Sequence, residues 1–252
     1  MRIDIVTLFP GMLAGPLDES IVGRARARGL VDLRIVDLRE HGEGRHRVVD
    51  DAPFGGGGGM VLKFGPLAAC LEGLRGPDTR VVLLDPAGRR FTQEIAWDLS
   101  RAAHLVLVCG RYEGVDERAR ELLVDEELSI GDYVLSGGEP GALVVADAVV
   151  RLVPGALGQA EAPERDSFAR GLLEHPHYTR PEVVTHEGAP RPVPPALLAG
   201  DHARVERWRR VMSVWRTWQR RPELLETADL GPEEQKWVDG FRQGRSPADY
   251  VN

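Results

Sequence analysis

The chain has 252 residues, of which 42% are hydrophobic and 28% charged, and its formal net charge is -7. This length allows one large domain or two smaller ones that bury roughly three quarters of the unfolded surface, and the acidic balance argues against a wholly basic nucleic-acid coat. All but two of the 32 basic residues are arginines placed unevenly along the chain, so local basic patches matter more than the total charge.

Short apolar runs alternate with helical patterns through about the first 155 residues. The predicted strands are Ile3–Leu8, Val31–Leu38, Arg80–Asp85, His104–Cys109 and Leu128–Leu135. The predicted helices are Thr92–Arg101, Val115–Val124 and Gly141–Val153. This alternation is typical of an α/β domain with a mostly parallel sheet.

A break in composition follows this alternation. Pro154-Gly155 ends the last of these helices, and residues 156–165, ALGQAEAPER, have the small and polar composition of a linker. Further on, helical patterns are predicted at Ala203–Arg220, Glu223–Thr227 and Pro232–Phe241. We therefore predict an α/β domain at 1–157, a flexible linker at 158–166 and a small α-helical domain at 167–252.

The amino-terminal segment and the cysteines indicate the compartment. MRIDIVTLFPG carries Asp4 and Pro10 where a signal peptide has an uninterrupted apolar stretch, and no apolar run approaches the roughly 18 residues of a membrane span. Cys70 and Cys109 have no metal-ligand spacing and suit a reducing environment, and Cys109 is expected to be buried in a strand. We expect a soluble cytoplasmic protein without a membrane partner.

Glycine-bearing turns follow three of the predicted strands. They are DPAG at 85–88, GRYEG at 110–114 and SGGE at 136–139. Ligands of parallel sheets bind at the carboxyl ends of the strands, where glycines bring bare backbone amides close, so these turns predict one shared pocket. The run FGGGGGM at 54–60 lacks the Gly-Lys-Ser/Thr ending of a P-loop and favours a flexible loop. No GxGxxG follows the first strand, which argues against a dinucleotide-binding oxidoreductase.

Six long segments, in the same order along the chain, resemble one family. They are RHRVVDDAPFGGGGGM at 45–60, LVLVCGRYEGVDER at 105–118, LSIGDYVLSGGE at 128–139, RLVPGALG at 151–158, DSFARGLLEHPHYTRPEV at 166–183 and WRTWQRRPELL at 215–225. On these motifs the chain is similar, almost end to end, to the bacterial tRNA (guanine-N1)-methyltransferases, the TrmD family of the SPOUT superfamily.

The resemblance implies both an activity and a fold. The activity is transfer of a methyl group from S-adenosylmethionine to N1 of guanosine 37 of tRNA, beside the anticodon, by a homodimer whose active sites are shared between subunits. The fold is an α/β domain with a deep trefoil knot, followed by a helical tRNA-binding domain. The residues by themselves favour an unknotted doubly wound sheet, because knots are rare in proteins.

The resemblance also implies which residues bind the methyl donor. They are Leu84, Gly110, Glu113, Ile130, Gly131, Asp132, Tyr133, Val134, Leu135, Gly137 and Gly138. Backbone groups at such turns can hold an adenine while Leu84, Ile130 and Leu135 form apolar walls, although plain core packing explains Ile130 and Leu135 equally well. Glu113 could face the cationic end of the donor or be solvated. Asp85 stands where serine is common in the family, and it adds a charge near this wall.

Two further residues are implied in the chemistry. Guanine N1 carries a proton, so a base must accept that proton as the methyl group leaves the sulfonium. The resemblance implies that Asp166 is this base and that Arg151 stabilises the negative charge that grows on guanine O6. The residues by themselves also fit a helix N-cap at Asp166 and a cation in a last helical turn at Arg151.

A basic segment of the second domain predicts contact with RNA. Residues 204–221 hold seven arginines and a single acid, Glu206, interleaved with three tryptophans. On a helix, Arg209, Arg216 and Arg220 share one face, which predicts binding to tRNA phosphates. The tryptophans are predicted to be core anchors and not base-stacking platforms.

The sequence identifies no metal site. His46, His175 and His177 stand in family-like motifs, but their spacing is not that of metal ligands, which favours solvated or hydrogen-bonded imidazoles. The family is reported to use magnesium, and no carboxylate cluster in the sequence indicates its ligands.

Two other functions remain open at this point. One is a SPOUT methyltransferase that acts on a ribose 2′-hydroxyl, and the other is a non-enzymatic RNA-binding module with a vestigial pocket. The block at 166–183 and the arginine-rich helix favour base methylation. Arg151, Asp166 and the glycine turns argue against a module without activity.

Overall fold

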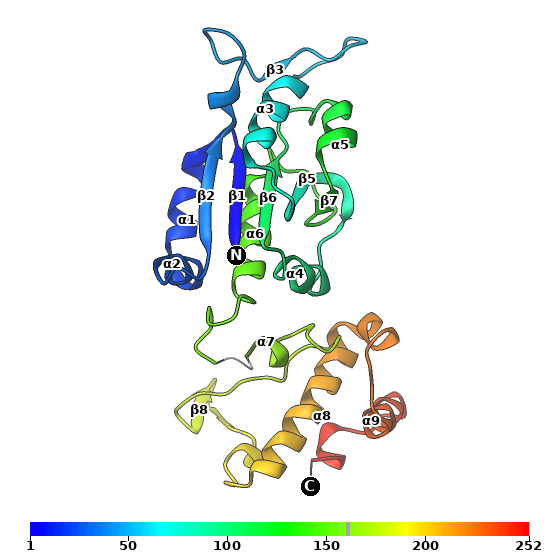
Figure 1. Cartoon of the computed structure of the whole chain (residues 1–252). Coiled ribbons are helices and arrows are strands. Elements are labelled where there is room, and N and C mark those ends of the chain that lie inside the picture. The colour runs from blue at the N-terminus through cyan, green and yellow to red at the C-terminus, as the bar shows by residue number, and fades with distance from the viewer. Residues whose placement is uncertain (160–161, 252) are drawn as a thin grey trace. The chain divides into compact units, whose positions relative to one another are not determined.

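The computed structural model describes residues 1–159 and 162–251 of the chain (Figure 1). Its contacts divide it into two compact units, Met1–Ala160 and Glu161–Asn252. Within the described residues, no helix has both the length and the apolar character needed to cross a membrane.

The first unit is built on a five-stranded parallel sheet with the order β2-β1-β6-β5-β7. Its strands are β1 (Arg2–Thr7), β2 (Asp32–Asp37), β5 (Thr79–Arg90), β6 (His104–Cys109) and β7 (Glu126–Ser129), and the short strands β3 (Asp50–Asp51) and β4 (Val61–Leu62) form a separate antiparallel pair. Its helices are α1 (Ala14–Asp18), α2 (Ser20–Ala27), α3 (Phe64–Leu74), α4 (Gln93–Leu99), α5 (Glu117–Leu123) and α6 (Glu139–Val150), with 3₁₀ turns at Pro10–Met12 and Leu38–His41.

Helices cover both faces of this sheet, which explains why its strands are nearly continuous apolar runs. In β6, Leu105 and Leu107 pack into the core shared with α2, α4 and α6, whereas Val106 and Val108 pack into the core shared with α3 and α5. The predicted α/β class is confirmed. Cys109, at the end of β6, is a buried free thiol, and burial raises its pKa well above the usual range.

One predicted strand of the first unit is partly wrong. Strand β6 has the predicted bounds, but β7 ends at Ser129, so the second half of the predicted strand Leu128–Leu135 is a loop. Val134 and Leu135 are 92% and 42% exposed, so their apolar character does not reflect burial in a sheet. Helices α1, α2 and α3 were not predicted.

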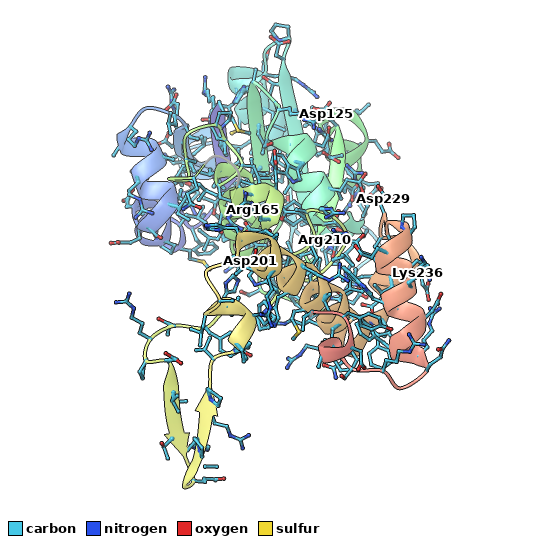
Figure 2. The ribbon with its side chains drawn as sticks, turned by 90° about the horizontal axis from the view of Figure 1, so that it is seen from below. Asp125, Arg165, Asp201, Arg210, Asp229 and Lys236 are labelled. Atoms are coloured by element: carbon cyan, nitrogen blue, oxygen red, sulfur yellow. The ribbon has the colours of Figure 1, made fainter. Side chains whose placement is uncertain are left out.

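The second unit is built on helix α8 (His202–Arg220), which packs against α9 (Pro232–Arg242). Asp201 lies at the start of α8 (Figure 2). Its carboxylate caps the helix by accepting hydrogen bonds from the backbone N–H groups of Ala203 and Arg204, at 3.0 and 3.2 Å. The buried core residues are Leu172, Val211, Val214, Trp237, Val238 and Phe241. Trp208 is also buried, and Trp215 and Trp218 pack against this core, which confirms the predicted role of the tryptophans.

The shorter elements of this unit overlap the predicted linker and correct one predicted helix. The predicted flexible linker 158–166 includes residues 160–161, which lie outside the described residues, and also the helix α7 (Ala162–Arg165). The predicted helix Glu223–Thr227 is a 3₁₀ helix at Pro222–Glu226, and further 3₁₀ turns lie at Pro195–Leu197 and Pro247–Asp249.

A β-hairpin makes the second unit more than the predicted helical domain. Strand β8 (Val183–His186) pairs antiparallel with β9 (Ala189–Pro192). The connecting residues Glu187 and Gly188 have φ values of 53° and 75°, as a type I′ turn requires. Almost all of the hairpin side chains are exposed. The sequence therefore shows no alternation of apolar and polar residues from which these strands could be predicted.

Candidate functional site

A cavity of about 390 Å³ lies in the first unit where β6 and β7 end and β5 leaves regular register. Its lining consists of residues 84–87, 110–114, 128–131 and 133–138, together with Arg120 and Gly141. The three predicted glycine-bearing turns therefore meet at one cavity. Of the residues that the resemblance assigns to a cofactor, all but Asp132 line it, and the Asp132 side chain is exposed.

Close backbone packing at Gly138 joins two walls of the cavity. Its N–H donates to the carbonyl oxygen of Gly110 at 2.8 Å, and Arg111 and Gly137 form an antiparallel bridge. A Cβ atom at Gly138 would lie 2.8 Å from the Cα atom of Cys109 and 3.0 Å from the nitrogen of Gly110. Because both neighbours are backbone atoms, only glycine permits this approach.

The loop after β7 is compact but presents apolar side chains to solvent. Gly131 has a φ of 152°, and its N–H donates to the Oγ of Ser129 at 3.2 Å. Tyr133, Val134 and Leu135 line the cavity and are 56%, 92% and 42% exposed. Exposed apolar groups around a concavity with backbone polar groups are typical of a small-molecule site.

A buried carboxylate, Glu139, lies behind the cavity at the first residue of α6. Its two oxygens accept hydrogen bonds from the Oγ1 of Thr7 at 2.8 Å and from the Nη1 of Arg111 at 3.3 Å. The Arg111 guanidinium lies 4.3 Å from the centroid of the Phe9 ring and also lines the cavity. The charge of Glu139 is therefore compensated inside the protein. Neither residue was predicted as functional from the sequence, where only their places within the CGRYEG and SGGE motifs could have indicated them.

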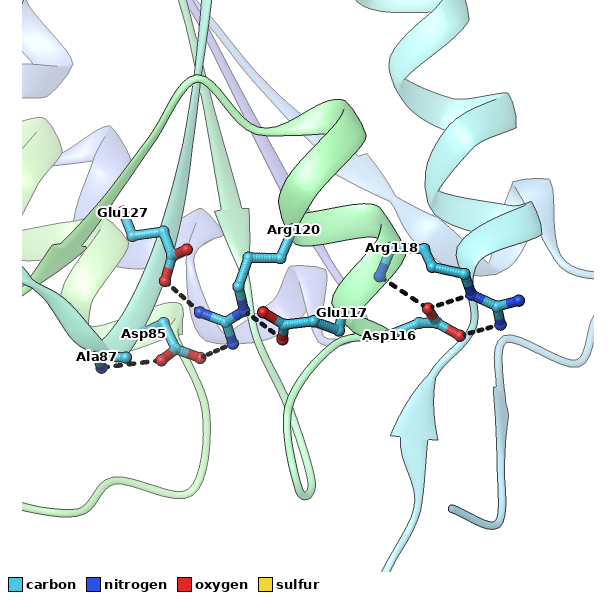
Figure 3. A network of polar contacts seen from close by, with 7 residues as sticks. All are labelled: Asp85, Ala87, Asp116, Glu117, Arg118, Arg120 and Glu127. Carbon is cyan, nitrogen blue, oxygen red and sulfur yellow. Dashed lines mark hydrogen bonds and ion pairs between the residues drawn. The ribbon is translucent and has the colours of Figure 1, made fainter. Parts of the chain in front are cut away.

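The charge of Asp85 at the cavity wall is compensated by Arg120 of α5 (Figure 3). The Nη2 of Arg120 lies 3.1 Å from the Oδ2 of Asp85, its Nε lies 3.1 Å from the Oε2 of Glu117, and it also pairs with Glu127. The other Asp85 oxygen accepts the Ala87 N–H at 2.9 Å. Burial alone would lower the pKa of Arg120, but the hydrogen bond and charge of Asp85 and the nearby glutamates raise it above the usual value. Asp85 therefore ties the wall to α5 and does not present a lone charge.

A second cavity, of about 330 Å³, lies within the second unit. Asp166 lines it together with Glu174, His175 and His177. The Oε1 of Glu174 lies 2.9 Å from the Nε2 of His177, and potential ligand atoms of Glu174 and the two histidines all lie within 4.8 Å of one another. The spacing of these histidines in the sequence does not predict a role as ligands, but the folded loop brings their nitrogens together with a carboxylate.

Arg151 belongs to the first unit. It is the C-cap residue of α6, where its N–H donates to the carbonyl oxygen of Asp147 at 3.2 Å. The position matches the expected last turn of a helix, and the cation there is favoured by the helix dipole.

The arginines of α8 fall into two groups. Arg207 and Arg210 pair with Glu233 of α9, and Arg210 also with Glu234, so both tie the two helices together. Of the predicted RNA-facing residues, Arg209 pairs with Glu206 of its own helix at 2.5 Å. The other two, Arg216 and Arg220, form no ion pair within the part of the chain that the structure describes.

A family model and several curated proteins match the chain over most of its length. The family model described as tRNA (Guanine-1)-methyltransferase TrmD matches residues 1–227. A tRNA (guanine-N(1)-)-methyltransferase of Geobacter metallireducens is 49% identical over 249 residues, covering 98% of this chain and 100% of that protein. Proteins of the same name from Geobacter sulfurreducens and Geobacillus kaustophilus are 52% and 48% identical, covering 93% and 97% of this chain and 95% and 100% of their own lengths.

Proposed function

Because the chain belongs to the tRNA (guanine-1)-methyltransferase family, TrmD, we propose that it transfers a methyl group from S-adenosylmethionine to N1 of guanosine 37 of tRNA. The observation that carries this proposal is the glycine-walled cavity at the carboxyl ends of β6 and β7, where an α/β sheet binds its ligand. The relatives are named for methylation of a guanine base, which disfavours both a ribose 2′-O-methyltransferase and a module without activity.

An assay of product identity tests this function. Purified protein is incubated with labelled methyl donor and unmodified tRNA, and the digested nucleosides are separated. We expect label in 1-methylguanosine, and a tRNA with another base at position 37 should accept none. Label in a ribose-methylated nucleoside, or no transfer at all, would overturn the proposal.

We assign the methyl donor to the cavity of the first unit. The volume of about 390 Å³ falls within the roughly 300–1,000 Å³ of small-molecule sites. Backbone groups near Gly110 and Gly131 would hold the polar edge of the adenine, and Leu84, Ile130 and Leu135 would form its apolar walls. The carboxylate of Glu113 would face a donor that carries a positive sulfonium.

The chemistry requires one proton to leave as one methyl group arrives. The lone pair of guanine N1 forms a bond to the methyl carbon, while the electron pair of the breaking C–S bond returns to sulfur and leaves S-adenosylhomocysteine. The Asp166 carboxylate would accept the N1 proton. The Arg151 guanidinium would stabilise the negative charge that grows on O6 as that proton leaves. Family membership supports both assignments.

One further family property, the knot, is part of the proposal. We infer a trefoil knot in the first unit, and the pinning of the loop after β7 to the loop after β6 through Gly138 and Gly110 is compatible with it. Magnesium is different, because it prefers oxygen ligands. The donor cluster found among residues 1–159 and 162–251 contains two imidazoles and one carboxylate, so we do not propose its members as magnesium ligands.

We also propose a homodimer in which one subunit binds the methyl donor and its partner delivers Asp166. A two-fold axis would then create two equivalent sites, each built from both chains. The family resemblance supports this arrangement.

Mixing two inactive variants tests the shared site. In Gly131→Trp, the new side chain enters space where even a Cβ atom would lie 2.4 Å from the Tyr133 ring, so donor binding should be blocked. Asp166→Ala should lack the base. We expect activity to reappear when the two variants are refolded together, because one of the two sites of the heterodimer is then unmutated. A heterodimer verified by mass spectrometry that stays inactive would contradict the shared site.

The basic face of α8 gives a prediction for RNA affinity. Replacing Arg209, Arg216 and Arg220 with glutamine should weaken tRNA binding and flatten its salt dependence, because each lost phosphate contact lowers the log–log slope by up to about one unit. Binding of S-adenosylmethionine should not change. The matched control is Arg207→Gln, since Arg207 pairs with Glu233 and its change should leave the slope as it is. An unchanged slope in the triple variant would show that this face does not bind RNA.

The Asp85–Arg120 contact gives a prediction for donor binding. Arg120→Gln should leave the Asp85 carboxylate uncompensated at the cavity wall and release residues 85–87. A hydrogen bond to a charged group is worth about 1.5 kcal/mol or more, so we expect the KM for S-adenosylmethionine to rise about tenfold with little change in kcat.

Helix α5 supplies the control for this prediction. Arg118 pairs with Asp116 at 2.6 Å, is 68% exposed and lies outside the cavity lining (Figure 3). Arg118→Gln should leave both kinetic constants unchanged. Adding Asp85→Asn to Arg120→Gln should lower the KM for S-adenosylmethionine part of the way back to the unmodified value, because it removes the uncompensated charge. Equal KM values for the two arginine variants would contradict a positioning role for Arg120.

A further inference from the structure

We propose that Glu174, His175 and His177 form a binding site for a divalent transition-metal ion of the zinc class. The three residues lie within one loop of the second unit, directly after Leu173, which is hydrogen-bonded to α8. Neither the family match nor the proposed reaction assigns them a ligand role.

The distances fit a small rearrangement into a metal centre. Zinc–ligand bonds of about 2.0–2.2 Å to nitrogen and oxygen place the ligand atoms of a tetrahedral site roughly 3.3 Å apart. The Oε1 of Glu174 and the Nε2 of His177 are already 2.9 Å apart, and each of the three residues has a potential ligand atom within 4.8 Å of those of the other two. Rotation of the side chains would bring them around one ion, and the loop itself could stay in place.

A hydrogen bond orients the His175 ring for metal binding. Its Nδ1 lies 3.2 Å from the carbonyl oxygen of Pro176, which can only accept, so Nδ1 carries the proton. The lone pair then lies on Nε2, which is the nitrogen free to bind a metal. Metal-binding histidines commonly donate their other ring N–H to a backbone carbonyl in this way.

The backbone on the amino-terminal side of the cluster is fixed. The Glu174 N–H donates to the Oγ of Ser167 at 3.0 Å, and the Leu173 N–H donates to the Oγ1 of Thr217 of α8 at 2.9 Å. The Ser213 hydroxyl of α8 donates to the carbonyl oxygen of Leu173 at 2.5 Å. Because these bonds already hold the backbone at Glu174, this ligand loses little backbone freedom when it binds an ion.

Three of the cations that line the same cavity, Arg170, Arg209 and Arg210, pair with carboxylates other than Glu174. Arg209 pairs with Glu206 at 2.5 Å, and Arg210 pairs with Glu234 at 3.4 Å. Glu174 lies beside His177 instead, with its Oε1 2.9 Å from the Nε2 of the imidazole, so this carboxylate is placed to bind an ion together with His177.

The donor set selects the class of ion. Two imidazoles and one carboxylate suit zinc and its neighbours in the first transition row, whereas magnesium and calcium prefer oxygen donors. Three protein ligands leave one tetrahedral position open, and Asp166 lines the same cavity. The ion would therefore lie in the cavity that holds the proposed catalytic base.

Titration of the intact chain with ZnCl₂ tests the site. Protein stripped with a chelator is titrated by calorimetry, and the bound metal is counted by elemental analysis after dialysis. We expect one zinc ion per chain and no comparable binding of MgCl₂. His177→Ala and Glu174→Gln should each weaken zinc binding at least about 10- to 100-fold, the loss that removal of an outer-shell partner alone causes. His177 is 63% exposed, so its replacement should not disturb folding.

A second His–Glu pair provides the matched control. His186 of β8 lies 3.9 Å from Glu187, and both are exposed, but they belong to no group of three potential ligands among the described residues. His186→Ala should bind zinc like the unmodified protein. The proposal is overturned if the unmodified protein retains no zinc, if His177→Ala and Glu174→Gln bind it as tightly as the unmodified protein, or if magnesium binds equally well.

Discussion

Asp166→Ala is expected to lose nearly all methyl transfer while it binds S-adenosylmethionine almost normally. General-base catalysis contributes about 10²- to 10⁴-fold to a rate, so the single-turnover rate should fall by a factor in that range. Donor affinity should be kept because Asp166 does not belong to the cavity assigned to the donor. Calorimetry with S-adenosylmethionine and a rapid-quench assay with tRNA measure the two quantities separately.

The neighbouring carboxylate of Glu164 is the control for this variant. It lines the same cavity two residues before Asp166, but no proton transfer is assigned to it. Glu164→Ala should therefore retain most of the single-turnover rate. If Asp166→Ala turns over like the unmodified enzyme, Asp166 is not the base. If the single-turnover rate of Glu164→Ala falls as far as that of Asp166→Ala, the reaction depends on the negative charge of the cavity and not on a single proton acceptor.

Gly138→Ala is expected to weaken donor binding strongly, because the added methyl group meets backbone on one side of the cavity. Its Cβ atom would lie 2.8 Å from the Cα atom of Cys109 and 3.0 Å from the nitrogen of Gly110, and neither can rotate away as a side chain could. Overpacking of this kind costs about 1–3 kcal/mol, which corresponds to roughly 5- to 150-fold in affinity if the bound form carries the strain. Calorimetry with S-adenosylmethionine measures the loss.

Gly73→Ala controls for the chemical change itself. Gly73 lies in α3, is exposed, and a Cβ atom there would meet nothing within 4 Å. Donor affinity should be unchanged, and a small gain in thermal stability is expected from the better helix former. Unaltered donor binding by Gly138→Ala would show that the donor does not use this cavity.

The sequence predicted the first unit well where burial alone decides structure. The run HLVLVC is apolar at successive positions because both faces of β6 are covered, and it needs no tertiary information to be recognised. The same reading of an apolar run as a buried strand was wrong at Val134 and Leu135, which line a cavity and do not lie in a strand. The β8–β9 hairpin escaped prediction since nearly every side chain in it is exposed.

The candidate sites were predictable only in part, for a different physical reason. The glycine turns carry a local signal, and the topology of a parallel sheet brings them to one edge. The partners of buried charged groups carry no such signal, because they lie far apart in the sequence and come together only in the folded protein. Asp85 pairs with Arg120 of α5, and Glu139 accepts a hydrogen bond from Thr7 of β1. In Glu174, His175 and His177 the residues are neighbours in sequence, but only the conformation of their loop decides whether their ligand atoms converge.

The exposed loop of Tyr133, Val134 and Leu135 gives the cavity a thermal signature. A ligand that covers these side chains removes apolar surface from water, and burial of apolar surface lowers the heat capacity of the system. The enthalpy of binding should then become more favourable with each degree of warming, while the entropy change becomes less favourable and offsets much of the gain. Because this loop is in contact with solvent in the free protein, the affinity of the cavity for its ligand should vary little over the temperatures at which the organism grows.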